Sequence, residues 1–171
     1  MNHPGLKQNS VFFKGLFSFL FILLLCASSA LATEISIAGI EAKPGQAIEM
    51  PIMIDEIENL AGMRLVLRYD ATLLAYKKSS KTKHTASLMH IVNDKKPGIL
   101  IIVMAGARGI KGKNFPILTL HFQVNGKAVG KKGAKITITE SQLMSDKLKN
   151  VTHSVKTAPV VVSAGKAKAV K

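Results

Sequence analysis

The sequence predicts an all-β protein whose strands pack as a two-sheet sandwich or jelly roll. Apolar residues recur at every second position in most segments, which is the period of a half-buried strand and not the 3.6-residue period of a helix. Clusters of Gly, Pro, Asn and Asp separate these segments at intervals of about 8 to 15 residues, a spacing typical of sandwiches and barrels. At 171 residues, the chain holds one ordinary domain.

The first 32 residues predict an export signal. Lys7 and Lys14 supply a positive start, and Leu16–Leu25 is an uncharged apolar run, shorter than the roughly 20 residues of a membrane-spanning helix. Ala30–Ala32 has the small-x-small pattern that signal peptidases cut after. A retained anchor and lipidation of Cys26 are the alternatives. We therefore expect a secreted, periplasmic or cell-envelope protein that touches the membrane only through its signal or a lipid.

Cleavage after Ala32 leaves 22 basic and 10 acidic residues, a net charge of +12. No cysteine remains, so an exported domain of this kind must be stabilised by burial without disulfides. Because 47% of the whole chain is hydrophobic, it is not a disordered polycation. We expect a folded domain over residues 33–163, followed by a basic, frayed tail at residues 164–171.

The first half of this domain contains three predicted strands. Ile35–Ile40 is followed by Lys43–Gln46, which has Pro and Gly at the central positions of a type II turn. Ile48–Ile54 and Met63–Tyr69 each alternate between apolar and polar residues, so one face of each strand is expected in the core and the other in water. The polar run Asp55–Asn59 is expected to interrupt the chain between these two strands.

The middle of the domain contains one segment that is apolar on both faces. Leu73–Tyr76 and Leu88–Val92 are predicted strands, and the Lys-, Ser- and Thr-rich residues 77–87 between them are expected to form a solvated loop. Ile99–Met104 then presents apolar side chains on both sides. In an antiparallel sheet, such a strand has one face that is partly exposed or covered by something other than the domain's own core.

The last part of the domain completes the sandwich. Phe115–Val124 alternates again, Lys135–Glu140 places Ile136 and Ile138 inward, and Val151–Val162 supplies the last strand. The segments amount to eight or nine short strands.

Two sets of segments follow one another in a characteristic order. The first set is Ile35–Ile40, Lys43-Pro44-Gly45-Gln46, Met50-Pro51-Ile52, Asn59–Met63, and Leu67-Arg68-Tyr69-Asp70 with Leu73-Leu74. The second set is Gly98–Met104, Ala105-Gly106, Gly109-Ile110 and Leu118–Val124. Together they resemble the cohesin domains over nearly the whole mature chain.

The resemblance implies a nine-stranded jelly roll whose flat outer sheet binds a dockerin, a small calcium-loaded protein. In cellulose-degrading bacteria this pairing attaches enzymes to a scaffold. Carried over by position, the partner-binding residues would be Arg64, Val66, Arg68, Ile99, Ile101 and Val103. Ile101 and Val103 would form the desolvated centre, and Arg64 and Arg68 the charged rim, of an interface of about 1,600 Å² in total.

The chain departs from the family at one of these positions. Arg64 stands where many type I cohesins have an acidic residue, so the face is expected to be basic. We therefore expect an acidic dockerin-like partner, because opposed potentials speed association and favour the correct partner. The alternative is that Ile99–Met104 is covered by the Lys-rich segment or by self-association.

The sequence contains no catalytic or metal-binding pattern, and we expect a non-catalytic protein without a cofactor. His84, His90, His121 and His153 are scattered and show no HExxH spacing. The acidic residues within 55–58 match no calcium-binding loop and are expected to form a solvated turn.

A carbohydrate-binding module, associated with polysaccharide breakdown or the cell envelope, is the alternative function. The mature chain has four aromatic residues and no tryptophan, which argues against a platform for crystalline cellulose but leaves a single-chain glycan site open. The charge predicts weak, salt-sensitive attraction to anionic envelope polymers. Nucleic acid is not an expected ligand, because no recognition helix or aromatic-basic pattern is present and export removes the protein from the genome.

Overall fold

A computed structural model describes residues 32–126 and 132–162 of the chain. The predicted tail, Cys26 and all of the predicted export signal except Ala32 lie outside the described residues. Within the described ranges the chain forms strands, turns and bends and no helix, so the predicted all-β sandwich is confirmed. The ten strands are β1 (Thr33–Ile37), β2 (Ile40–Ala42), β3 (Ala47–Arg68), β4 (Leu74–Lys81), β5 (Met89–Asn93), β6 (Ile99–Val124), β7 (Lys132–Ala134), β8 (Thr137–Met144), β9 (His153–Thr157) and β10 (Val160–Val162).

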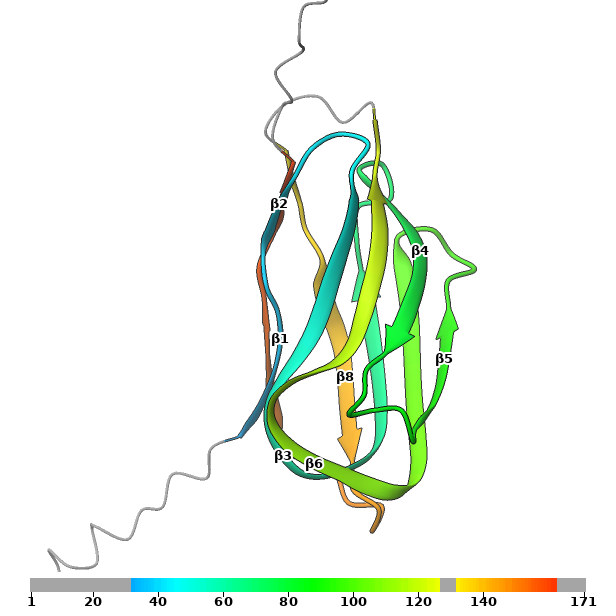
Figure 1. The fold of residues 1–171 in the computed structure, drawn as a ribbon, viewed down its shortest axis with the longest axis vertical. Coiled ribbons are helices and arrows are strands. Elements are labelled where there is room, and N and C mark those ends of the chain that lie inside the picture. Colours follow the sequence, from blue (N-terminus) through cyan, green and yellow to red (C-terminus); the bar gives the residue numbers. More distant parts are fainter. Residues whose placement is uncertain (1–31, 127–131, 163–171) are drawn as a thin grey trace, which may run out of the picture. The chain divides into compact units, whose positions relative to one another are not determined.

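Two long antiparallel strands, β3 and β6, form the frame of the sandwich (Figure 1). Their pairing runs from Ala47 opposite Gln123 to Arg68 opposite Ile99. Both strands bend at the lower end in Figure 1, where the register shifts near Leu60. Such β-bulges increase the local twist and bend a strand. The run that was expected to interrupt the chain therefore remains within β3, and each long strand contributes one half to each layer.

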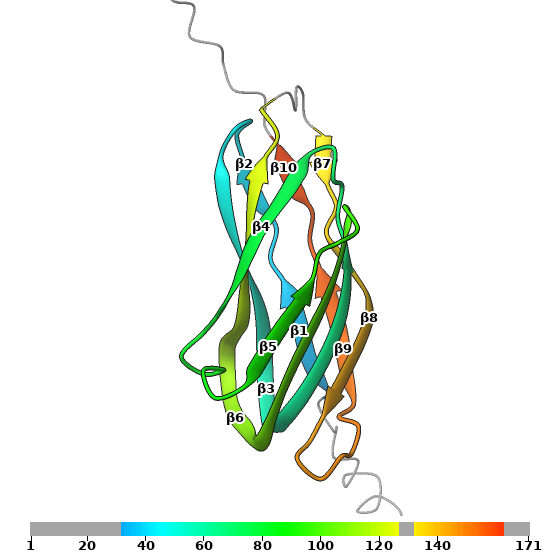
Figure 2. The same ribbon diagram turned by 90° about the vertical axis from the view of Figure 1, so that its right-hand side faces the viewer.

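The two layers share a single seven-stranded sheet that folds over at this bend (Figures 1 and 2). In one layer, β4, β6, β3, β1 and β9 lie in that order; in the other, β5 pairs with β6 and β8 pairs with β3. Apolar side chains from both layers fill the space between them, and each fully buried one contributes about 1.5–3 kcal/mol. The largest include Ile35, Met50, Ile52, Ile54, Leu65, Leu67, Leu100 and Phe122.

The first two and the last two described strands close the sandwich together. β1 pairs with β9 and β2 pairs with β10, and both pairs are parallel. Between these pairs the chain breaks at Gly39 and at Pro159, where the backbones are so close that a Cβ on Gly39 would lie 2.8 Å from the Pro159 carbonyl oxygen. Beyond the breaks, β2, β10 and β7 form a separate three-stranded sheet. The breaks raise the number of strands, whereas the continuity of β3 and β6 lowers it. Together they explain why the described residues divide into ten strands instead of the nine implied by the resemblance.

The turn between β2 and β3 has the geometry that its sequence predicts. The Gln46 amide donates to the Lys43 carbonyl at 3.1 Å, and Gly45 has φ of 77°. This positive φ suits glycine at the third position of a type II turn.

The Lys-rich segment 77–87 is more ordered than the predicted solvated loop. β4 continues to Lys81, whose ammonium group donates to the carbonyls of Ala86 and Leu88 at 2.8 Å each. Thr85 is fully buried, and its hydroxyl donates to the Ile117 carbonyl at 2.8 Å. The prediction of a loop was wrong here because the order comes from polar side chains that bind backbone carbonyls, which hydrophobic periodicity does not reveal.

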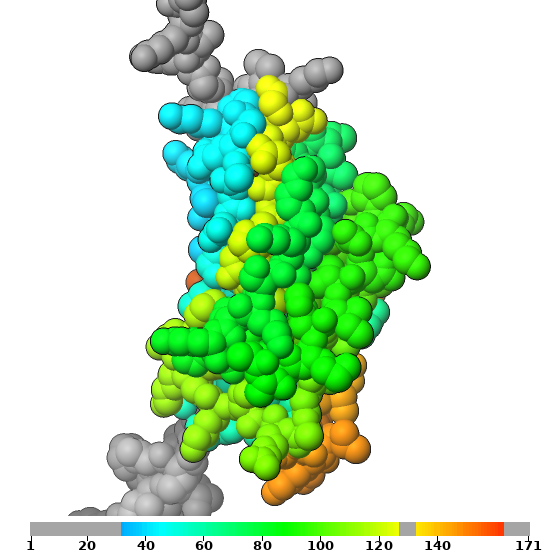
Figure 3. Space-filling model, turned by 45° about the vertical axis from the view of Figure 1, so that its right-hand side comes forward, coloured from blue at the N-terminus to red at the C-terminus, as the bar shows by residue number. Residues whose placement is uncertain are grey.

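β4 and β5 are the edge strands on one side of the sandwich. The segment that contains them, coloured green, occupies the middle of the surface in Figure 3. A contact joins them, because the Ser79 hydroxyl lies 2.9 Å from Nε2 of His90. Burial, together with the positive charge of Lys81, lowers the pKa of His90 below its ordinary value. The neutral imidazole is therefore the form that the fold favours.

Gly109→Ala should destabilise the fold, because a Cβ there would overlap the side chain of Asn59. That side chain donates to Oδ1 of Asp146 at 2.7 Å and accepts from its amide at 3.1 Å, so it cannot move without losing both bonds. We expect a loss of about 1–3 kcal/mol in the free energy of unfolding, measured by chemical denaturation. The matched control is Gly126→Ala, whose Cβ meets nothing within 4 Å and which should be neutral or slightly stabilising. Equal effects of the two substitutions would contradict the prediction.

His90→Gln should reduce the loss of folding stability that accompanies a fall in pH. As the pH falls below about 6.5, the unfolded chain takes up a proton on His90 that the folded chain resists, so the free energy of unfolding decreases until the lower folded pKa is passed. The wild type should therefore lose more stability than His90→Gln between about pH 7.5 and 5.5, with no difference from this residue above that range. Thermal unfolding across this range measures the two slopes, and parallel curves would show that His90 titrates alike in both states.

Candidate partner-binding face

The residues that the resemblance assigns to a partner-binding face lie together on one layer of the structure. The layer has the strand order β5, β6, β3 and β8. The register pairs Arg64 with Val103, Val66 with Ile101, and Arg68 with Ile99. Directly paired residues share a face of the sheet. Since the alternating residues Leu100, Ile102 and Met104 are buried in the core, the six paired side chains point outward. We call this surface the outer face.

An exposed apolar centre lies on the outer face where β5 meets β6. Ile91 is directly opposite Val103, and the two side chains are 61% and 38% exposed. Met89, opposite Ala105, is 68% exposed, and Ile101 is partly exposed beside them. Large apolar side chains that remain in contact with water at adjacent positions are a mark of an interaction surface. We call Met89, Ile91, Ile101 and Val103 the apolar centre.

Sequence reasoning missed the part of this centre that β5 contributes. Leu88–Val92 was predicted as a strand, but its pairing partner was not known, so Met89 and Ile91 could not be assigned to a face. The signal was the alternation of Met89 and Ile91 with His90 and Val92, which the structure shows to be partly buried.

Val66 contributes less surface than its assignment to the interface implies. It is only 7% exposed, because it lies in an inner strand with Ile101 on one side and Glu140 on the other. Its position supports the shape of the outer face and leaves little area for a partner.

The outer face is less basic than the sequence predicts. Arg64 donates to a carboxylate oxygen of Glu140 on the neighbouring β8 at 2.7 Å, so one of the two arginines is already paired. Exposed pairs of this kind contribute about 0–1 kcal/mol and can be exchanged for another partner at little cost. Arg68 has no salt bridge within residues 32–126 and 132–162. The unneutralised positive charge is therefore concentrated at the Arg68 end of the face.

The Lys-rich segment does not cover the outer face. β4 pairs with Leu118–Val124 of β6, which belongs to the other layer, and the turn after it is tied to Pro116 and Ile117. Ile91 and Val103 accordingly remain exposed. The alternative that the Lys-rich segment covers Ile99–Met104 is therefore contradicted. The alternative that this surface is covered by self-association stays open.

A polar network crosses the opposite layer. The Ser80 hydroxyl lies 3.0 Å from Nε2 of His121, whose Nδ1 lies 3.4 Å from a carboxylate oxygen of Glu49. The order hydroxyl, imidazole, carboxylate is that of a nucleophilic relay. Glu49, however, is largely exposed, and the three residues lie side by side on the surface of paired strands β4, β6 and β3, where water competes for each contact. We assign the network to cross-strand stabilisation.

The acidic residues near the bend also have structural partners. Oδ1 of Asp55 accepts from the amides of Glu34 and Glu56, and Glu56 pairs with Lys113 at 2.6 Å. No group of three or more His, Cys, Asp or Glu in the described ranges is placed to hold a metal ion. The same ranges contain no helix that is long and apolar enough to cross a membrane.

Comparison with known proteins gives a family assignment. The family model described as "Cohesin domain" matches residues 33–162. A search of curated proteins found no match.

Several solved structures share the fold. The sixth cohesin of scaffoldin B from Acetivibrio cellulolyticus, in complex with a Cel5 dockerin mutant, has a TM-score of 0.67 and 18% identity over 78% of this chain and 99% of its own. A non-cellulosomal cohesin from Archaeoglobus fulgidus has a TM-score of 0.69 and 15% identity over 79% and 94%. A type I cohesin–dockerin complex from Clostridium thermocellum has a TM-score of 0.68 and 17% identity over 78% and 95%. At these identities the likeness establishes the jelly-roll sandwich and not the ligand.

Proposed function

Because the chain belongs to the cohesin domain family, we propose that it is a non-catalytic recognition module that binds a dockerin-like protein through its outer face. The observation that carries this proposal is the apolar centre, where Ile91 and Val103 lie opposite each other in register and remain exposed. Related structures that were determined as complexes with dockerins support the same class of partner.

Binding would proceed by docking of a preformed, flat surface. The outer face rests on paired strands whose inner side chains are fixed in the core, so little conformational entropy is lost when a partner binds. Removal of the apolar centre from water supplies the favourable free energy, at about 25 cal/mol per Å² of apolar surface. At the rim, Arg68 would pair with acidic residues of the partner. Arg64 would do the same after it gives up its salt bridge to Glu140.

We also propose that the module acts outside the cytoplasm, in the secreted fraction or the cell envelope, after cleavage of its signal. The partner would be calcium-loaded, as the family resemblance implies, whereas no calcium site is assigned to this chain. The net charge of +12 after cleavage would add a weak attraction to anionic envelope polymers, which salt should screen.

Val103→Asp should abolish partner binding without unfolding the domain. The carboxylate would replace apolar surface in the middle of the interface and lose its water when the partner binds, and any pairing with Arg64, its neighbour in register, would take that arginine from the partner. We expect an affinity loss of at least about 100-fold. The measurement is calorimetric titration of the chain from residue 33 onward with a calcium-loaded type I dockerin. The same titration would be run with any protein that the wild-type chain captures from the secreted and envelope fractions of its own organism in calcium but not in chelator.

The control for this experiment is Ser36→Asp. Ser36 lies on β1 in the other layer and alternates with the buried Ile35 and Ile37, so its side chain points outward and the substitution adds the same charge away from the outer face. Retained binding by Val103→Asp, or an equal loss in both variants, would exclude the outer face as the interface.

Arg68→Glu should slow association with an acidic partner. Reversal of the unpaired charge at the end of the face should reduce the association rate by about tenfold at low salt, and the difference should shrink as salt screens it. Lys156→Glu on β9, which is also exposed, changes the net charge equally and is the control. Stopped-flow or surface-based kinetics at two salt concentrations measure the effect, and faster association of Arg68→Glu would mean that the partner is basic.

A further inference from the structure

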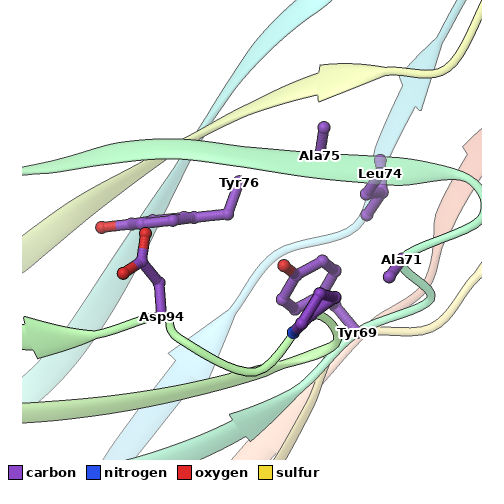
Figure 4. A pocket seen from close by; sticks show the side chains of 7 residues that line it. Tyr69, Ala71, Leu74, Ala75, Tyr76 and Asp94 are labelled. Carbon is purple, nitrogen blue, oxygen red and sulfur yellow. The ribbon is translucent and has the colours of Figure 1, made fainter.

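A pocket lies between β4, the residues that follow β3, and the turn that joins β5 to β6 (Figure 4). Its volume is about 270 Å³, just below the roughly 300–1,000 Å³ of pockets that enclose drug-sized ligands. Tyr69, Tyr76, Asp94 and Pro97 supply its ring-bearing and polar walls, and small aliphatic side chains supply the rest. A pocket of this size admits one ring of a larger molecule whose remainder stays in solvent.

The two tyrosine rings are held in place by one buried aromatic residue. Phe122 packs edge-on against Tyr69 at 5.2 Å between ring centroids and against Tyr76 at 5.7 Å. Because Phe122 is fixed in the core, both rings keep their orientation in the empty pocket. Figure 4 shows the two rings on either side of the space, with the Asp94 carboxylate beside the Tyr76 ring, so the walls are in place before a ligand binds.

The backbone around the pocket is fixed as well. The Tyr69 amide donates to the Gly98 carbonyl at 3.0 Å, and the Ile99 amide donates to the Lys96 carbonyl at 3.1 Å. These bonds tie the end of β3 to the turn that carries Asp94 and Pro97. The walls are therefore set by the same pairing of β3 with β6 that forms the sandwich.

The pocket offers a hydrogen-bond acceptor, the carboxylate of Asp94. The Asp94 carboxylate points toward the Tyr76 ring in Figure 4, and it makes no hydrogen bond or salt bridge within the described ranges. Burial raises the pKa of Tyr76; a hydrogen bond with Ser79 opposes this shift, and the nearby charge of Asp94 adds to it. The phenol therefore stays uncharged, with Ser79 as its hydrogen-bond partner, and the Asp94 carboxylate can accept several hydrogen bonds from a ligand.

The surrounding charge restricts the ligand to a neutral one. Asp94 is followed by Lys95 and Lys96, and Asp70 lies between the lining residues Tyr69 and Ala71, so both signs of charge are close to the pocket. The two lysines oppose a cation, and the carboxylate inside the pocket opposes an anion. A neutral ring with an apolar face and hydroxyl groups at its edge satisfies both conditions, since the face packs on tyrosine and the hydroxyls donate to a carboxylate.

We propose that this pocket binds one neutral pyranose residue of a polysaccharide, with the sugar face on the Tyr76 ring and a pair of sugar hydroxyls on Asp94. The site is separate from the outer face. Tyr69 follows Arg68 in the chain and packs on Phe122 of the core, while Arg68 is exposed on the outer face. The proposal therefore stands independently of the partner-binding function.

The composition of the chain provides a direct probe for the test. The protein has two tyrosines and no tryptophan, and both tyrosines line the pocket, so its intrinsic fluorescence reports only on this site. Cellotetraose, chitotetraose and galactobiose would be titrated into the chain from residue 33 onward, into the millimolar range. At least one should change the tyrosine emission in a saturable way.

Three variants make the result specific. Asp94→Asn keeps the shape of the side chain and should weaken sugar binding at least tenfold, whereas Glu41→Gln on β2, which removes an exposed carboxylate elsewhere, should leave it unchanged. Val103→Asp should bind sugar as the wild type does, so a failure of dockerin binding and a failure of sugar binding can be told apart. Absence of any saturable change, or unaltered binding by Asp94→Asn, would overturn the proposal. Saturation by tetramethylammonium or glucuronic acid but by none of the neutral sugars would overturn it in favour of a charged ligand.

Discussion

The antiparallel pairing of β3 with β6 is the interaction on which the rest of the structure depends. These two strands share a register that extends over both layers, and every other strand of the seven-stranded sheet is added to one or other of them, directly or through β1. The register shifts near Leu60 turn the ribbon back on itself, so that residues of one strand face each other across the core. Were the ribbon straight, it would be a flat two-sided sheet with no interior.

This pairing also determines what the outer face can present. A strand alternates strictly, so once Leu100, Ile102 and Met104 are committed to the core, Ile101 and Val103 must point outward. Core packing explains why the inward-facing residues are apolar, but it does not explain why the outward-facing ones are. Polar residues would serve equally well at the outer positions and would cost less in contact with water, as the polar residues on the outer side of β8 show. Core packing does not explain why Ile91 and Val103 are apolar. A partner that covers these two side chains would explain it.

Much of the fold could be predicted because it rests on local patterns. Alternation identified most strands, and Pro44-Gly45 fixed a turn that the structure reproduces. The features that escaped prediction depend on contacts between distant residues or on polar groups. The continuity of β3 through its acidic run depends on pairing with β6, and the length of β4 depends on Lys81 bonds to carbonyls.

The same distinction applies to the candidate sites. The positions on β3 and β6 could be placed from their alternation and the family resemblance. The contribution of β5 required its pairing partner, and the bond between Arg64 and Glu140 joins residues 76 positions apart. Tyr69 and Tyr76 lie in two different predicted strands, Met63–Tyr69 and Leu73–Tyr76, and Asp94 lies in neither. Only the fold brings them against the same face of the structure as Asp94.

The outer face and the pocket differ in the physics that would govern their ligands. The face is broad and open, so its affinity depends on how much apolar area a partner covers, and its choice of partner depends on the charge at the Arg68 end. The pocket is small, and its selectivity depends on two fixed rings and one carboxylate. Because Arg68 and Tyr69 are adjacent in the chain but belong to different surfaces, occupancy of one site need not displace the ligand of the other. A module built in this way could hold a protein partner and a polysaccharide chain together, with the rigid β3–β6 ribbon as the spacer between them.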